Sequence, residues 1–204
     1  MKKKTRSIVF MAVLMGLMLL FGFTPVGYIP LPFAVITIMC LPVIIGTLVL
    51  GLKMGMGLSL VFILTSIAQL FMAPDALSQV ALSENPAGYI LCLVIPRLLI
   101  PVATWAMERA LKGKMPRGGL FLASAVGSLV NTFGYLLMVR ALVFDALQAA
   151  YTLNAVGANA LIWGVALTNG LPEAVIALIV CPFVVMALRK SIPSLDRPKE
   201  RAAV

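Results

Sequence analysis

Long runs without a charged residue constrain this chain more than any other feature. Residues 7–23 and 24–52 contain no Asp, Glu, Lys or Arg, and further apolar runs continue to about residue 189. A helix that crosses a bilayer needs about 20 mostly apolar residues, so several of these runs are long enough. The chain is 62% hydrophobic and only 11% charged, with a mean hydropathy of +1.08. This composition excludes a soluble globular domain and a disordered chain.

The sequence predicts an all-α integral membrane protein, a bundle of six transmembrane helices. Residues 24–32 are rich in Pro and Gly and are expected to form an outer loop, whereas 73–87 are polar and are expected to form a second one. We expect a single domain over residues 1–190 and a polar tail over 191–204. The first run also fits a signal peptide, but no small-x-small cleavage site follows it, which favours a retained helix. The six helices are expected at about 7–23, 33–50, 56–72, 88–111, 120–143 and 154–189, the last interrupted at Gly170, Pro172 and Pro182.

The distribution of basic residues predicts the orientation of the chain. Under six spans, 14 of the 16 Lys and Arg residues fall on one side, and cytoplasmic loops of membrane proteins collect such residues. Both termini are therefore expected in the cytoplasm, and the net charge of +9 reflects topology rather than a nucleic-acid partner. Asp75, Glu84 and Asp145 fall on the outer side, with Arg140 near the end of its helix. The 14 residues are Lys2, Lys3, Lys4, Arg6, Lys53, Arg109, Lys112, Lys114, Arg117, Arg189, Lys190, Arg197, Lys199 and Arg201.

Several chemistries are excluded or disfavoured by missing residue types and motifs. The chain has no His, and Cys40, Cys92 and Cys181 lie far apart in apolar runs, so we expect no metal, no cofactor and no disulfide. These cysteines are expected to act as small apolar residues. No phosphate-binding G-x-x-x-x-G-K-[ST] loop is present, and G-x-S-x-G is missing too. A binding protein is therefore favoured over an enzyme.

Arg97 and Glu173 are charged residues that the topology does not explain. Arg97 lies deep in a predicted span between Pro96 and Pro101, and Glu173 follows Pro172. A charge at the centre of a bilayer costs about 2.5–3.5 kcal/mol, so it usually faces the bundle interior and has a partner. Arg97 is expected either to pair with Glu173 or to bind an anionic ligand, and the sequence leaves both open. Its planar guanidinium suits a carboxylate because it donates two parallel hydrogen bonds.

Further polar residues share helical faces with the same region of the predicted bundle. One helical face carries Ser124, Ser128, Asn131 and Tyr135, spaced four, three and four residues apart, and Thr132 flanks it. A second face carries Ser59, Ser66 and Gln69, with Thr65 beside it, and Asn169 lies one turn before Glu173. Helix packing is the alternative role for all of them, and the Ser and Thr hydroxyls can also bond back to their own helices. The residues expected to contact a ligand are Ser66, Gln69, Asn131, Thr132, Tyr135 and Asn169.

Taken together, the motifs resemble those of a known family of membrane proteins. The relevant segments are LPVIIG at 41–46, LGLKMG at 50–55, IPR at 95–97, GSLVNT at 127–132 and NGLPEA at 169–174. In their order and spacing they resemble the substrate-binding S component of an energy-coupling factor (ECF) vitamin transporter, and they are most similar to pantothenate-type members.

The resemblance implies a vitamin site near the outer face, covered by the loop after the first helix. It also implies a bacterial cytoplasmic membrane location and three partner chains: a transmembrane coupling subunit and two ABC-type ATPases. The S component of such transporters is thought to topple in the bilayer to carry its cargo inward. Ala12 and Gly16 match the surface that meets the coupling subunit, although the family form there is Ala-x-x-x-Ala, so Gly16 departs from it.

Pantothenate fits the predicted site because its carboxylate suits Arg97, and its hydroxyl and amide groups suit Gln69, Asn131 and Asn169. Another vitamin or a small anionic precursor would satisfy the same groups. Two other functions stay open from the residues alone. One is a small intramembrane enzyme that uses Arg97, Glu173 and Asn131, and the other is a structural membrane protein whose polar residues only pack helices.

Overall fold

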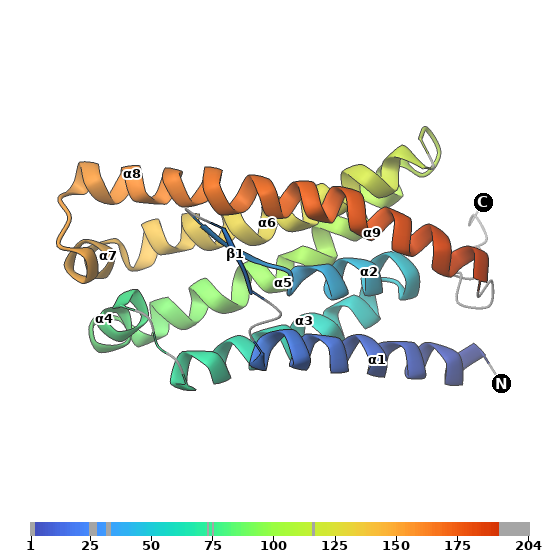
Figure 1. Cartoon of the computed structure of the whole chain (residues 1–204), viewed down its shortest axis with the longest axis horizontal. Helices are drawn as coiled ribbons and strands as arrows, with labels where there is room; N and C mark the ends of the chain where they lie inside the picture. Colours follow the sequence, from blue (N-terminus) through green and yellow to red (C-terminus); the bar gives the residue numbers. More distant parts are fainter. Residues whose placement is uncertain are drawn as a thin grey trace, which may run out of the picture.

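The chain folds into a bundle of helices with one short strand pair near its middle (Figure 1). The computed structural model describes residues 3–24, 28–31, 34–72, 74, 76–115 and 117–191. In order, the elements are α1 (Lys3–Phe23), β1 (Tyr28–Leu31), β2 (Ala34–Thr37), α2 (Cys40–Leu50), α3 (Leu52–Met72), α4 (Ala76–Glu84), α5 (Pro86–Leu111), α6 (Gly118–Leu142), α7 (Phe144–Tyr151), α8 (Ala155–Val165), the π-helical segment η2 (Ala166–Gly170) and α9 (Leu171–Ser191).

Five helices among the described residues are long and apolar enough to cross a membrane. They are Thr5–Phe23, Leu52–Met72, Pro86–Leu111, Gly118–Leu142 and the continuous run Ala155–Ser191. The predicted all-α membrane fold is therefore confirmed. The predicted second span, 33–50, was wrong at its beginning, because Ala34–Thr37 forms a strand and α2 begins only at Cys40. Its 11 residues rise about 16 Å, roughly half the thickness of the hydrocarbon core.

The strand pair replaces the first turns of the predicted second helix. β1 and β2 are antiparallel, with Tyr28 opposite Thr37 and Leu31 opposite Ala34. Val35, Ile36 and Thr37 are β-branched and favour extended backbone, which explains why the chain is not yet helical there. β2 contacts η2 and α9, so the hairpin lies against the place where the last helix changes its geometry.

The two ends of the bundle differ in charge. α1 begins and α9 ends at the same end of the molecule, to the right in Figure 1. The tight turn at Gly51 and the basic connection between α5 and α6 belong to this end as well, and we call it the basic end. The positive φ of Gly51, 95°, suits a glycine in such a turn. Lys2, Arg197, Lys199, Arg201 and Asp75 lie outside the described residues, as does the tail after Ser191.

Two predicted loops contain short helices. α4 and α7 pack against each other at the end opposite the basic end (Figure 1). Each helix buries an apolar face, through Leu77 and Ala81 on α4 and through Ala146 and Leu147 on α7. The sequence predicted these segments as connections between spans from their polar residues, and the apolar residues between them explain the short helices.

Buried apolar residues form two separate clusters along the bundle. The basic-end cluster surrounds α2, whose residues Cys40–Val49 are all buried, and draws on α1, α3, α5, α6 and α9. The opposite-end cluster joins α4, α7 and α8 to the far halves of α3, α5 and α6. A stretch of α3, of α5, of α6 and of the last helix therefore lies between the clusters and belongs to neither.

Candidate functional site

Most of the polar residues that the sequence predicted as a site lie between the two apolar clusters. On α5, the opposite-end cluster reaches Leu93 and the basic-end cluster begins at Ile100. On the last helix, Ala166 belongs to one cluster and Ala177 to the other. We call the intervening region the polar layer. It contains Ser66 and Gln69 of α3, Arg97 of α5, Asn131 and Thr132 of α6, Asn169 of η2 and Glu173 of α9, whereas Tyr135 of α6 packs against the opposite-end cluster.

Glu173 is the most buried charged residue of the polar layer, with 4% of its surface exposed. The hydroxyl of Thr132 donates to its Oε2 at 3.1 Å, and the thiol of Cys40 donates to its Oε1 at 3.2 Å. Helices α2, α6 and α9 therefore meet at this carboxylate. Cys40 was predicted only as a small apolar residue, so its contact with Glu173 was not expected. A thiol is also a weak donor, and the position of Cys40 at the start of α2 could have suggested a polar partner.

The backbone before Glu173 is irregular, as the sequence predicted. Residues Ala166–Gly170 form the π-helical segment η2, and Pro172 follows after Leu171. Proline has no backbone N–H, so a regular i→i−4 ladder is broken at this point, and π-helical turns are frequent at functional sites. Gly170 permits a close approach, because a Cβ there would lie 3.0 Å from Cγ2 of Thr132.

Arg97 is held at the interface between α5 and α3. Its Nη1 donates to the carbonyl of Leu93 at 2.7 Å, and its guanidinium carbon lies 4.7 Å from the ring centroid of Phe62. The carbonyl of Arg97 accepts a hydrogen bond from the hydroxyl of Ser59 at 2.9 Å. Pro101 explains this contact, since it lacks the N–H that would otherwise bond that carbonyl.

Helix α6 lies beside both charged residues. Thr132 contacts Glu173 directly, and a Cβ on Gly134 would lie 3.1 Å from Cβ of Pro96, the neighbour of Arg97. Helices α9 and α5 therefore approach α6 at positions only two residues apart, Thr132 and Gly134. Whether the two charges also pair with each other stays a prediction.

Two buried side-chain oxygens of the layer have no hydrogen-bond partner within the described part of the chain. These are the hydroxyl oxygen of Ser66 and the side-chain carbonyl oxygen of Asn169. Leaving such an atom unpaired costs about 1–3 kcal/mol, so each is a position where a bound molecule would be stabilised. Asn131 and Tyr135 are partly buried, one turn apart on α6.

Other predicted residues have structural contacts. Gln69 donates through its side-chain nitrogen to the carbonyl of Gly22 near the end of α1, so its proposed ligand contact stays a prediction. Ser124 and Thr65 bond back to carbonyls of their own helices, the alternative role expected for such hydroxyls. Ala12 and Gly16 are exposed on α1, outside the polar layer. Within the described ranges, no group of three or more metal-ligating side chains comes together.

Comparison with known families identifies the class of protein. A family model described as the substrate-specific component of an ECF transporter matches residues 6–185. Because this match covers most of the chain, the protein belongs to the family of ECF transporter substrate-specific components. These are transport proteins rather than enzymes, and they work with a coupling subunit and ATPases on a small-molecule substrate. No curated protein sequence matches the chain significantly.

Proposed function

We propose that this protein binds a small water-soluble vitamin, with pantothenate as the best candidate, for ATP-driven uptake across a bacterial cytoplasmic membrane. The observation that carries the proposal is the polar layer itself. In a chain that is 62% hydrophobic, an arginine, a buried glutamate and two unpaired buried oxygens share one level between two apolar clusters. Such groups are costly inside a membrane protein and mark substrate sites by default.

Each group of the proposed site has a distinct role toward pantothenate. Arg97 binds the carboxylate through charge-assisted hydrogen bonds, which are about twice as strong as neutral ones. The oxygen of Asn169 accepts from a ligand hydroxyl or amide N–H, and Ser66 donates to or accepts from the ligand. Glu173 fixes Thr132 and the irregular turn of η2 at the edge of the site. The β1–β2 hairpin, which contacts η2 and α9, covers the ligand.

A binding assay on the isolated chain tests the proposal. We expect one molecule of pantothenate to bind in mild detergent, measured by calorimetry and by native mass spectrometry against a panel of vitamins. Binding of a different vitamin or of a small anionic precursor would keep the transport function and change the cargo. If no member of the panel binds and no small molecule copurifies, the protein is instead a structural membrane component, and the proposed function is wrong.

The coupling subunit is proposed to dock on α1. This helix is the least buried of the candidate spans, since only 17% of the residues in its most apolar 18-residue stretch are buried in the bundle. Ala12 and Gly16 lie on its exposed surface, and a Cβ on Gly16 would meet no atom within 4 Å. Small residues let another helix approach closely. The two ATPases bind the coupling subunit on the cytoplasmic side, which we assign to the basic end by its positive charge.

Replacing Gly16 by leucine should separate assembly from vitamin binding. The leucine has room within this chain, so the isolated variant is expected to fold and bind vitamin as the wild type does. Copurification with the coupling subunit should fall about tenfold or more, because a side chain now holds the helices apart. Gly164→Leu is the matched control, since that glycine on α8 also has open space around it. Equal copurification of both variants would exclude Gly16 from the interface.

A further inference from the structure

A groove lies on the outside of the bundle, away from the polar layer. α6 and α8 enclose this groove, which has a volume of about 240 Å³, near the end opposite the basic end. Leu136, Ile162 and Ala166 form its buried floor. Its rim is apolar and exposed, with 60% of Leu137 and 61% of Trp163 accessible. Both helices belong to candidate spans, so this surface faces the hydrocarbon of the bilayer.

Arg140 lines one end of this groove. It lies 22 residues beyond Gly118, a rise of about 33 Å along α6, which places it at the headgroup level of a bilayer whose hydrocarbon core is about 30 Å thick. Its side chain is exposed, its Nη1 donates to Asn159 of α8 across the groove, and its guanidinium carbon lies 5.2 Å from the ring centroid of Phe144.

The charge of Arg140 is not neutralised by a carboxylate within the part of the chain that the structure describes. The nearest acid in the sequence, Asp145, forms no ion pair with it, and the ion pair described in the bundle lies at the basic end. A guanidinium has five N–H donors. One of the five is used toward Asn159, so the others are available to an anion in the headgroup region.

We propose that the groove holds one acyl chain of a phospholipid from the outer leaflet, with the lipid phosphate bound by Arg140. Arginine and phosphate form strong bidentate hydrogen bonds, and tryptophan is favoured at the boundary between headgroups and acyl chains. A free phosphate would satisfy Arg140 but would leave the apolar groove below it empty. A phospholipid supplies a phosphate to Arg140 and an acyl chain to the apolar groove. The bound chain would reach Ala166, the first residue of η2.

Native mass spectrometry with added phosphatidylglycerol tests this site. We expect the wild type to retain one lipid more tightly than further lipids, and Arg140→Gln to weaken this first binding about tenfold, or about 1.4 kcal/mol. Arg109→Gln is the matched control. Arg109 is also exposed near the end of a span, with its guanidinium 5.1 Å from the ring of Trp105, but it does not line the groove. Its lipid binding should equal that of the wild type.

A phosphatidylglycerol with a photoreactive group in its acyl chain provides a test without substitution. Crosslinks are expected in residues 133–140 and 159–166, and millimolar inorganic phosphate should not displace the lipid. The proposal is overturned if crosslinks avoid both segments, if phosphate alone displaces the lipid, or if the two arginine variants lose lipid equally. Vitamin binding should be unchanged in Arg140→Gln, so failure of the lipid site is distinguishable from failure of the vitamin site.

Discussion

Replacing Arg97 by alanine should weaken the binding of a carboxylate-bearing vitamin at least about 100-fold. Removing one partner of a buried, hydrogen-bonded charge pair costs about 2–5 kcal/mol, and about 2.7 kcal/mol corresponds to 100-fold in affinity. Arg97 is already positioned for this role by Phe62 beneath its guanidinium and by the carbonyl of Leu93. Calorimetric titration of the purified variant measures the loss.

Two controls separate a lost ligand contact from general damage at Arg97. The first is Arg140→Gln, an arginine substitution within a span but outside the polar layer, which should leave the vitamin affinity unchanged. The second is an analogue in which an alcohol replaces the carboxylate. The wild type should prefer the vitamin strongly over this analogue, whereas Arg97→Ala should discriminate little between them. If Arg97→Ala retains the wild-type affinity and preference, Arg97 does not bind the carboxylate.

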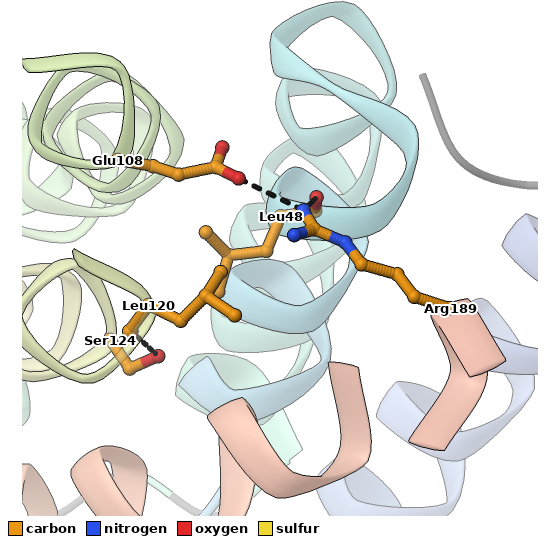
Figure 2. Close-up of polar contacts among 5 residues, drawn as sticks. All are labelled: Leu48, Glu108, Leu120, Ser124 and Arg189. Atoms are coloured by element: carbon orange, nitrogen blue, oxygen red, sulfur yellow. Dashed lines mark hydrogen bonds and ion pairs between the residues drawn. The ribbon is translucent and has the colours of Figure 1, made fainter. Parts of the chain in front are cut away.

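Replacing Glu108 by alanine should destabilise the basic end of the bundle by about 2 kcal/mol. Arg189 of α9 donates to Oε1 of Glu108 at 2.9 Å and to the carbonyl of Leu48 at 2.8 Å (Figure 2). The side chain of Glu108 is 8% exposed and that of Arg189 is 28% exposed. Breaking a fully buried pair costs about 3–5 kcal/mol, and partial exposure of Arg189 reduces this value. The apparent melting temperature in detergent should fall by about 4–8 °C.

This contact joins three helices because α2 ends beside it. The turn at Gly51 interrupts the helix after Leu50, so the last carbonyls of α2 need partners from outside their own helix. Arg189 supplies one of these partners. The double variant Glu108→Gln/Arg189→Gln should be more stable than Glu108→Ala, since neither charge is then left alone. Arg109→Gln, on the same helix but exposed, should not change the melting temperature. A Glu108→Ala protein as stable as the wild type would show that the ion pair contributes nothing.

The sequence was sufficient to predict the membrane fold and to single out the two charged residues on which the candidate site rests. Apolar runs located the five long spans because burial in lipid demands them. Arg97 and Glu173 stood out because charges within such runs are costly. The interruption before Glu173 followed from Gly170 and Pro172, and it is present as η2.

Other features depend on tertiary contacts and could not be predicted from one sequence. α2 is shorter than its apolar run because β-branched residues before it pair as a strand. The contact of Cys40 with Glu173 joins residues 133 positions apart, and the hydroxyl of Ser59 reaches Arg97 of another helix. Neither pairing produces a local pattern in the chain. Both arise where proline or a buried charge leaves a polar group that a neighbouring helix must satisfy.

Because the apolar interior is divided into two clusters, a molecule bound between them is expected to stabilise the bundle. Each cluster holds its own half of the bundle together, while the helices that cross the polar layer are joined there by contacts such as those of Glu173 with Thr132 and Cys40. A molecule bound in that layer contacts both halves and stabilises the folded state by mass action. On the proposed function, the vitamin is thus a non-covalent link between the two halves of the bundle as well as the transported molecule. Its release is expected to lower the stability of the polar layer.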